Sequence, residues 1–280
     1  MRTVTEQAYG KINLYLDVLG RREDGYHNIE SVMQTVSLCD TVTVTEAVGI
    51  SMTCTDPTLT CGEDNLCIKA ARAFFKAFPI KGGGCRIALT KTLPREAGLG
   101  GGSADAAAVL RALNRIYGKP LTTDTLRVVG GKIGADIPFC LKGKGAALTM
   151  GIGEILSSFP ALPDCYVVIT NGIGKVSTPR AYALLDTLPP VVMRDRYTLE
   201  EAMTKGSLPE IGFALYNRFE DAHPASRTVV SLFDALGADG ARMTGSGAAV
   251  FGLFSQKEKA AHACEVLEAA GLKAYLARPI

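Results

Sequence analysis

Apolar and polar residues alternate along several short stretches of the chain. Residues 11–18 read Lys-Ile-Asn-Leu-Tyr-Leu-Asp-Val, and this alternation predicts a strand with one buried face. Because strand side chains repeat every second residue, Lys11 and Asn13 share the polar face. The same signal predicts further strands around Val42 and Val44, at residues 87–93 and at residues 248–254.

Helical spacing recurs between these strands. Leu110, Leu113 and Tyr117 fall on one side of a helix over residues 107–117. Further helices are predicted at 66–78 after a cap at Asp64-Asn65, after a Thr198/Glu201 capping box, at 213–221, at 225–236, and at 257–270 before Gly271. Interleaved strands and helices predict a mixed α/β (α+β) fold.

The length of the chain indicates two domains. Its 280 residues exceed the typical domain of about 100–150 residues. A glycine-rich stretch at residues 143–153 tolerates the turns that a crossover between domains needs. We therefore expect an N-terminal domain over residues 1–150 and a C-terminal domain over residues 151–280.

Composition excludes several classes of function. The formal net charge is +2 and no block of five like charges occurs, which argues against a nucleic-acid or polybasic membrane surface. No apolar run approaches the roughly 18–20 residues that span a bilayer, and the N-terminus lacks a signal-peptide core, so we expect a cytoplasmic protein. The eight cysteines contain no C-x-x-C pair, which favours small buried thiols over disulfides or zinc ligands.

The most informative segment is a glycine loop between a predicted strand and a predicted helix. Residues 94–108 read Pro-Arg-Glu-Ala-Gly-Leu-Gly-Gly-Gly-Ser-Ala-Asp-Ala-Ala-Ala. Four glycines in five positions let backbone N–H groups approach an anion at the start of a helix, which is the physical basis of a phosphate cradle. The alternative is a flexible turn with Ser103 as an ordinary helix cap. The segment fits neither the dinucleotide fingerprint nor the P-loop pattern.

Three motifs then carry a resemblance to a known family. Residues 94–108 resemble the second motif of the GHMP kinase superfamily, residues 8–14 resemble its first motif, and residues 242–251 its third, in the expected order. Within the superfamily, residues 20–27 and 134–139 are similar to segments of the 4-diphosphocytidyl-2-C-methyl-D-erythritol kinases of non-mevalonate isoprenoid biosynthesis. The resemblance implies an N-terminal ribosomal-protein-like domain and a C-terminal ferredoxin-like domain.

The resemblance also implies ATP as phosphate donor, brought in with Mg²⁺. Phosphoryl transfer needs positive charge and a carboxylate that takes the proton of the attacking hydroxyl. We expect Asp136 to be this base and Lys11 to keep it ionised. Alternatively, Asp136 is an N-cap or turn residue after Gly134, and Lys11 is a solvated strand residue. Ser103 is a candidate metal ligand. The residues expected to bind ATP are Pro94, Arg95, Glu96, Ala97, Gly98, Leu99, Gly100, Gly101, Gly102, Ser103 and Ala104.

The implied acceptor is a small molecule with a cytidine diphosphate end. By resemblance, Tyr26 and Tyr182 stack on the base and His27 reads its edge; Tyr182 could equally be a packed helix residue. Asn13 is expected to contact the acceptor alcohol, or else to be a polar residue at a strand edge. Gly245 and Ser246 are expected to support the substrate.

Two departures from the family pattern concern the phosphate loop and its surroundings. Tyr9-Gly10 stands where a proline is usual, and Ala104 replaces a second serine. Neither position carries the proposed chemistry. The alternatives are another GHMP kinase, acting on mevalonate, phosphomevalonate or homoserine, a non-catalytic nucleotide-binding relative, and a nucleic-acid module.

Overall fold

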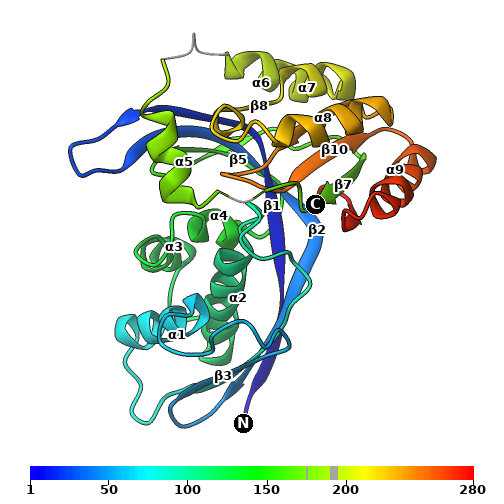
Figure 1. Ribbon diagram of the computed structural model, residues 1–280. Coiled ribbons are helices and arrows are strands. Elements are labelled where there is room, and N and C mark those ends of the chain that lie inside the picture. Colours follow the sequence, from blue (N-terminus) through cyan, green and yellow to red (C-terminus); the bar gives the residue numbers. More distant parts are fainter. Residues whose placement is uncertain (175, 190–194) are drawn as a thin grey trace. The chain divides into compact units, whose positions relative to one another are not determined.

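A computed structural model describes residues 1–174, 176–189 and 195–280 (Figure 1). The helices are α1 (Leu66–Ala77), α2 (Gly101–Ile116), α3 (Thr123–Gly131), α4 (Ile137–Lys142), α5 (Thr178–Leu185), α6 (Arg196–Lys205), α7 (Leu208–Ala214), α8 (Ser226–Ala235) and α9 (Lys257–Ala269). The strands are β1 (Thr3–Arg21), β2 (His27–Glu46), β3 (Ile50–Cys54), β4 (Cys85–Thr90), β5 (Ala146–Gly151), β6 (Ile155–Phe159), β7 (Tyr166–Thr170), β8 (Tyr216–Asn217), β9 (Gly240–Met243), β10 (Val250–Phe254) and β11 (Ala274–Ala277).

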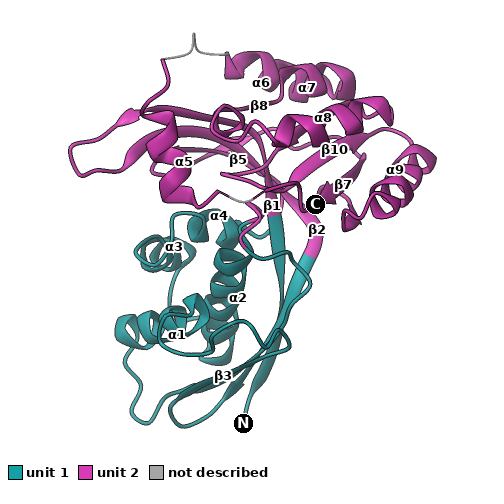
Figure 2. Ribbon diagram, in the orientation of Figure 1, with its two compact units in different colours: residues 1–10, 39–95, 100–143 teal, residues 11–38, 96–99, 144–280 magenta. Residues whose placement is uncertain are grey.

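The chain divides into two compact units, each built from several stretches of sequence (Figure 2). Unit 1 comprises Met1–Gly10, Cys39–Arg95 and Gly100–Gly143, and unit 2 comprises Lys11–Leu38, Glu96–Leu99 and Lys144–Ile280. The last change of unit falls at the start of the glycine-rich stretch 143–153. A single boundary between residues 150 and 151 stays a prediction.

Unit 1 combines a sheet with helices that pack against one another. Residues 41–46 of β2 pair antiparallel with β4, and β3 runs parallel to β4. Helix α2 packs on α1 and α4. It is buried on almost every side, and its alanines, Ala104, Ala106, Ala107, Ala108 and Ala112, allow this close approach because they carry only a methyl group.

Unit 2 contains the C-terminal sheet. Its strands lie in the order β11-β7-β10-β9, all antiparallel to their neighbours. Helix α8 connects to β9 and packs on β9 and β10, and α9 lies between β10 and β11 in the chain and packs on β7 and β11. This β-α-β-β-α-β order with β7 and β10 in the centre is the expected ferredoxin-like arrangement. β5 and β6 form a hairpin in which β5 pairs with residues 29–34 of β2.

Several predicted elements are confirmed and two are wrong. Asn65 caps α1 through its side chain, and Gly271 follows α9 with positive φ. The Thr198/Glu201 capping box does not form because Asp195 caps α6 and Glu201 pairs with Lys205.

The predicted helix 213–221 is also wrong. This segment contains the end of α7, the short strand β8 and a 3₁₀ turn. Tyr216 pairs with Tyr15 of β1, and Asn217 accepts a hydrogen bond from the N–H of Phe219. Pairing with β1 outcompetes the helix because it satisfies the same backbone groups inside the core. All eight cysteines are free thiols, and half of them are buried.

Candidate active site

The glycine loop joins the end of β4 to the start of α2. Gly98 and Gly100 have φ of 83° and 67°, in the left-handed region that side chains with a Cβ avoid. Gly100 is the N-cap of α2, and no side chain caps the helix. Ser103 lies inside the first turn, so the alternative in which Ser103 is the helix cap is wrong. The first turn of α2 carries no acidic residue, so its N–H groups face no negative side chain of their own helix.

The loop packs backbone against backbone on the third motif. A Cβ on Gly98 would lie 2.0 Å from the carbonyl oxygen of Thr244, and one on Gly245 would lie 2.8 Å from Cα of Gly98. The loop is also anchored by backbone bonds from Lys11 N to Leu99 O (3.0 Å) and from Ala249 to Ala97. Only glycine fits at positions 98 and 245, because any side chain would push the two segments apart.

Asn13 is the centre of a buried hydrogen-bond network. Its side-chain oxygen accepts from Lys11 Nζ at 2.6 Å and from the Gly245 N–H at 3.0 Å. Its Nδ2 donates to Ser31 Oγ at 2.8 Å, and its backbone N–H donates to Thr244 Oγ1 at 3.0 Å. Asn13 is 1% exposed, so it is not a polar residue at a strand edge. The network joins the first and third motifs within unit 2.

Asp136 precedes α4 in unit 1. It occupies the N-cap position at the end of a turn, as the alternative expected, and its carboxylate makes no capping hydrogen bond. The turn before it lies next to the glycine loop, because a Cβ on Gly134 would be 3.6 Å from Ser103 Oγ. Lys11 is in unit 2 and is 4% exposed. It is therefore a buried residue and not a solvated strand lysine.

A buried ion cluster fixes both ends of the loop within unit 1. Lys91 Nζ, just after β4, bonds to Asp40 and lies 3.1 Å from Asp105 Oδ2 on α2. Asp40 also accepts from the N–H groups of Thr92 and Leu93 at 2.5 and 2.8 Å. One ammonium between two buried carboxylates leaves a net negative charge unless one carboxyl holds a proton.

Asp105 is the carboxyl of this cluster whose pKa is clearly raised. Burial raises the pKa of Asp105 to about 8; Lys91 opposes the rise and Asp40 adds to it. Burial by itself would lower the pKa of Lys91, but the Asp105 and Asp40 carboxylates outweigh it and raise this pKa. The ammonium form of Lys91 is therefore stabilised between its two partners.

The residues expected to form the cytidine site lie in unit 2. His27 is buried, and its ring stacks on Tyr182 with centroids 4.5 Å apart and planes 15° apart. His27 Nε2 lies 2.8 Å from Asp186 Oδ1. Tyr182 also meets the edge of Phe219. Tyr26 is 61% exposed, so the stack that the structure forms is His27 on Tyr182, and the pairing of Tyr26 with Tyr182 around a base stays a prediction.

Ser246 and Gly245 are held by neighbours that sequence reasoning did not name. Ser246 Oγ lies 2.8 Å from Thr178 Oγ1 at the start of α5. Asn217 Nδ2 donates to the carbonyl oxygens of Met243 and Gly245 at 2.6 and 2.9 Å. These bonds fix the turn of the third motif.

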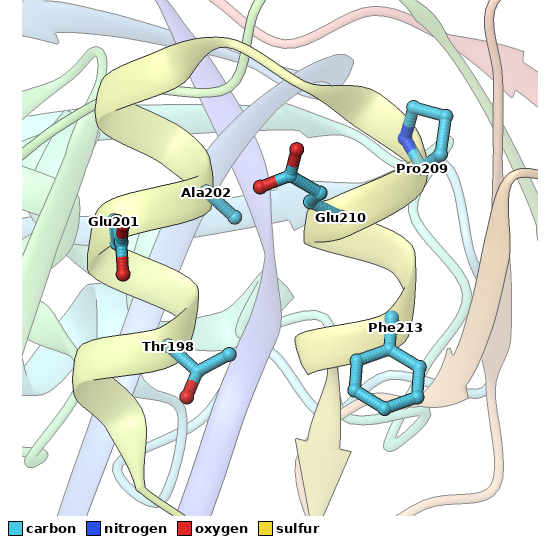
Figure 3. A pocket seen from close by; sticks show the side chains of 6 residues that line it. All are labelled: Thr198, Glu201, Ala202, Pro209, Glu210 and Phe213. Atoms are coloured by element: carbon cyan, nitrogen blue, oxygen red, sulfur yellow. The ribbon is translucent and has the colours of Figure 1, made fainter.

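Other features of the structure lie outside these motifs. A hollow of about 300 Å³ is lined by α6 and α7 (Figure 3). Its described lining residues, none of which is a predicted site residue, are Thr198, Glu201, Ala202, Pro209, Glu210 and Phe213.

Within the described ranges, no three His, Cys, Asp or Glu residues are grouped to hold a metal ion. No described helix has the length and apolar character needed to cross a membrane.

Comparisons with known proteins decide the family. The model for the GHMP kinases N-terminal domain matches residues 65–144, and that for the GHMP kinases C-terminal domain matches residues 183–273. A 4-diphosphocytidyl-2-C-methyl-D-erythritol kinase of Desulfitobacterium hafniense is 39% identical over 90% of this chain and 88% of that protein. The chain belongs to this family of GHMP kinases.

Further relatives agree. A kinase of the same name from Acaryochloris marina is 39% identical over 93% of this chain and 90% of its own length. The crystal structure of a 4-(cytidine 5'-diphospho)-2C-methyl-D-erythritol kinase superposes with a TM-score of 0.81 at 34% identity, covering 98% of both chains. The expected two-domain architecture is thereby confirmed, and the GHMP kinase is an ATP-dependent enzyme with a small-molecule substrate.

Proposed function

We propose that this kinase transfers the γ-phosphate of ATP to the 2-hydroxyl of 4-diphosphocytidyl-2-C-methyl-D-erythritol, giving the 2-phosphate and ADP for non-mevalonate isoprenoid synthesis. The observation that carries the proposal is that one chain has both a glycine loop at the start of α2, which no side chain caps, and a stack of buried His27 on half-buried Tyr182 that is suited to a pyrimidine. Compact acceptors such as mevalonate or homoserine offer no base for such a stack.

Residues of unit 1 supply the base and part of the nucleotide site. Asp136 takes the proton of the 2-hydroxyl. The oxygen of that hydroxyl forms a bond to the γ-phosphorus, while the bond from phosphorus to the bridging oxygen of ADP breaks. A carboxylate is a group that can take this proton in the transition state. Residues 94–104 surround the phosphates, and α2 directs its positive end, with the N–H groups of its first residues, at them.

Residues of unit 2 supply positive charge and recognition. Lys11 keeps Asp136 ionised and stabilises the charge that develops in transfer, held in place by the 2.6 Å bond to Asn13. His27, Tyr26 and Tyr182 bind the cytosine, and Gly245 and Ser246 support the rest of the substrate. Magnesium, when bound, neutralises phosphate charge, and the Ser103 hydroxyl is the side chain that fits it, beside the turn that carries Asp136.

We place the reaction in the cytoplasm. Eight free cysteines fit a reducing compartment, and the near-neutral charge gives no attraction for nucleic acid.

A coupled ADP-release assay tests the function. The enzyme is supplied with MgATP and either the cytidylyl substrate, mevalonate or homoserine. Turnover is expected only with the cytidylyl substrate, and Asp136→Asn should lower kcat by about 10³-fold. Asp124→Asn is the matched control, since Asp124 is an exposed aspartate of α3 in the same unit and its carboxylate pairs with Arg127. Turnover with another acceptor would overturn the cytidylyl proposal, and an active Asp136→Asn variant would overturn the base.

A further inference from the structure

The ring of His27 is held from two sides by one helix. Tyr182 and Asp186 are four residues apart at the end of α5, so they lie on the same side of it. Tyr182 covers a face of the imidazole, and Asp186 Oδ1 lies 2.8 Å from its Nε2. The Asp186 N–H donates to the carbonyl oxygen of Tyr182 at 3.0 Å, which fixes the carboxylate against the turn of the helix. The ring therefore has a set orientation.

The carboxylate also decides which nitrogen of the ring carries a proton. An ionised aspartate only accepts hydrogen bonds, so Nε2 must donate. In the neutral imidazole Nδ1 then has a lone pair and acts as an acceptor. Over the part of the chain that the structure describes, Nδ1 of His27 makes no hydrogen bond, and Asp186 has no cationic partner besides this ring. The acceptor at Nδ1 is left for a ligand.

We propose that Asp186 is a positioning residue that gives this kinase its preference for cytosine over uracil. The inference rests on the proposed function and adds its specificity determinant. The 4-amino group of cytosine donates, and it meets the lone pair of His27 Nδ1. Uracil has a carbonyl oxygen at that position, and two acceptors facing each other leave a polar group unpaired in a partly buried site. The tautomer set by Asp186 therefore accepts a hydrogen bond from the 4-amino group of cytosine and finds no donor at that position of uracil.

Asparagine at position 186 separates this role from simple packing. Asp186→Asn keeps the size of the side chain, but its Nδ2 can donate to Nε2, which moves the ring proton to Nδ1. The tautomer that donates at Nδ1 then suits uracil. Asp186→Glu keeps an acceptor-only carboxylate and should restore the original tautomer. Asp234→Asn is the control for the loss of one negative charge, because Asp234 is an exposed aspartate on α8 in the same unit.

The first readout is the tautomer itself. With ¹⁵N-labelled histidine, two-bond NMR correlations show which ring nitrogen is protonated, and the chain has only three histidines to assign. We expect the His27 proton on Nε2 in the wild type, Asp234→Asn and Asp186→Glu, and a shift toward Nδ1 in Asp186→Asn. A wild-type proton on Nδ1, or an unchanged spectrum in Asp186→Asn, would overturn the proposal.

The second readout is binding of cytidine 5'-diphosphate against uridine 5'-diphosphate by titration calorimetry. The wild type should bind the cytidine nucleotide about tenfold more tightly, and Asp186→Asn should bring the two affinities within about twofold. Equal wild-type affinities, no binding of either nucleotide, or an unchanged ratio in Asp186→Asn would each refute it. These measurements need no turnover. Absence of ADP release with the cytidylyl substrate would therefore count against the proposed function alone, while the nucleotide ratio still decides the role of Asp186.

Discussion

Replacing Asp105 with asparagine should remove part of the alkaline instability of the folded chain. Asp105 shares the buried Lys91 ammonium with Asp40, and its pKa is raised from 3.8 to about 8. In the unfolded chain the carboxyl ionises near its ordinary pKa. Between these two values the unfolded state releases the proton first, so the free energy of unfolding falls as pH rises, and the loss is complete once pH passes the folded pKa.

The size of the effect follows from the two pKa values. Each pH unit inside the window is worth about 1.4 kcal/mol. Between pH 5 and pH 8.5 the Asp105 contribution therefore falls by about 4 kcal/mol at most. An asparagine is neutral in both states and adds no such slope. The stability of Asp105→Asn relative to the wild type should accordingly rise by up to about 4 kcal/mol over this range.

Urea unfolding followed by far-ultraviolet circular dichroism is the assay, since the chain has no tryptophan for fluorescence. Asp40→Asn is the contrasting variant. Asp40 accepts hydrogen bonds from Lys91 and from two backbone N–H groups, so its neutralisation should cost about 2 kcal/mol at pH 5. Because the Asp40 charge also contributes to the raised pKa of Asp105, Asp40→Asn should in addition have a shallower pH slope than the wild type. If Asp105→Asn has the same pH slope as the wild type, Asp105 is ionised throughout, and the assignment of the proton to this carboxyl is refuted.

Three further variants test the architecture of the site. Gly98→Ala should lower the free energy of unfolding by more than about 2 kcal/mol, because its Cβ would meet the Thr244 carbonyl in a backbone conformation with φ of 83°; a melting temperature equal to that of the wild type would contradict this. Lys11→Met should lower kcat about 100-fold or more with little change in melting temperature, since it removes a buried charge without opening a cavity. Asn13→Ala should cost about 2–3 kcal/mol in urea unfolding, because it removes the oxygen that accepts from the Lys11 ammonium and the Gly245 N–H.

Local patterns predicted the elements that are stabilised locally. The side-chain cap of Asn65 is a feature of α1 alone, and the apolar spacing of residues 107–117 is a feature of α2 alone; both are observed. The first turns of α2 escaped prediction because Gly-Gly-Ser has a low helix propensity. That segment is helical because α2 is buried against α1 and α4, where small residues permit close packing. The capping box and the 213–221 helix failed where Asp195 and pairing with β1 offered better partners.

The candidate site shows the same contrast between residues that local sequence patterns predict and residues that only the fold brings together. Motifs in the sequence predicted Lys11, Asp136 and the glycine loop as site residues, but they did not predict the side chains packed around Lys11 and the loop. Ser31 and Thr244 lie 18 and 231 residues from Asn13, and strand register rather than sequence spacing brings them into contact. Lys91 and Asp40 likewise meet only through the pairing of β2 with β4. Their polar character is visible in the sequence, yet their burial is not.

The network around Asn13 limits what this residue can do for catalysis. A carboxamide has two N–H donors and an oxygen with two lone pairs. The oxygen is occupied by Lys11 and the Gly245 N–H, and one donor is taken by Ser31. One N–H is left for an acceptor alcohol, on a side chain that is almost fully buried. The stronger effect of Asn13 is then exerted through the Lys11 ammonium that it orients. Asn13→Ala should lower kcat more than it raises KM for the acceptor, whereas a dominant direct contact would do the opposite.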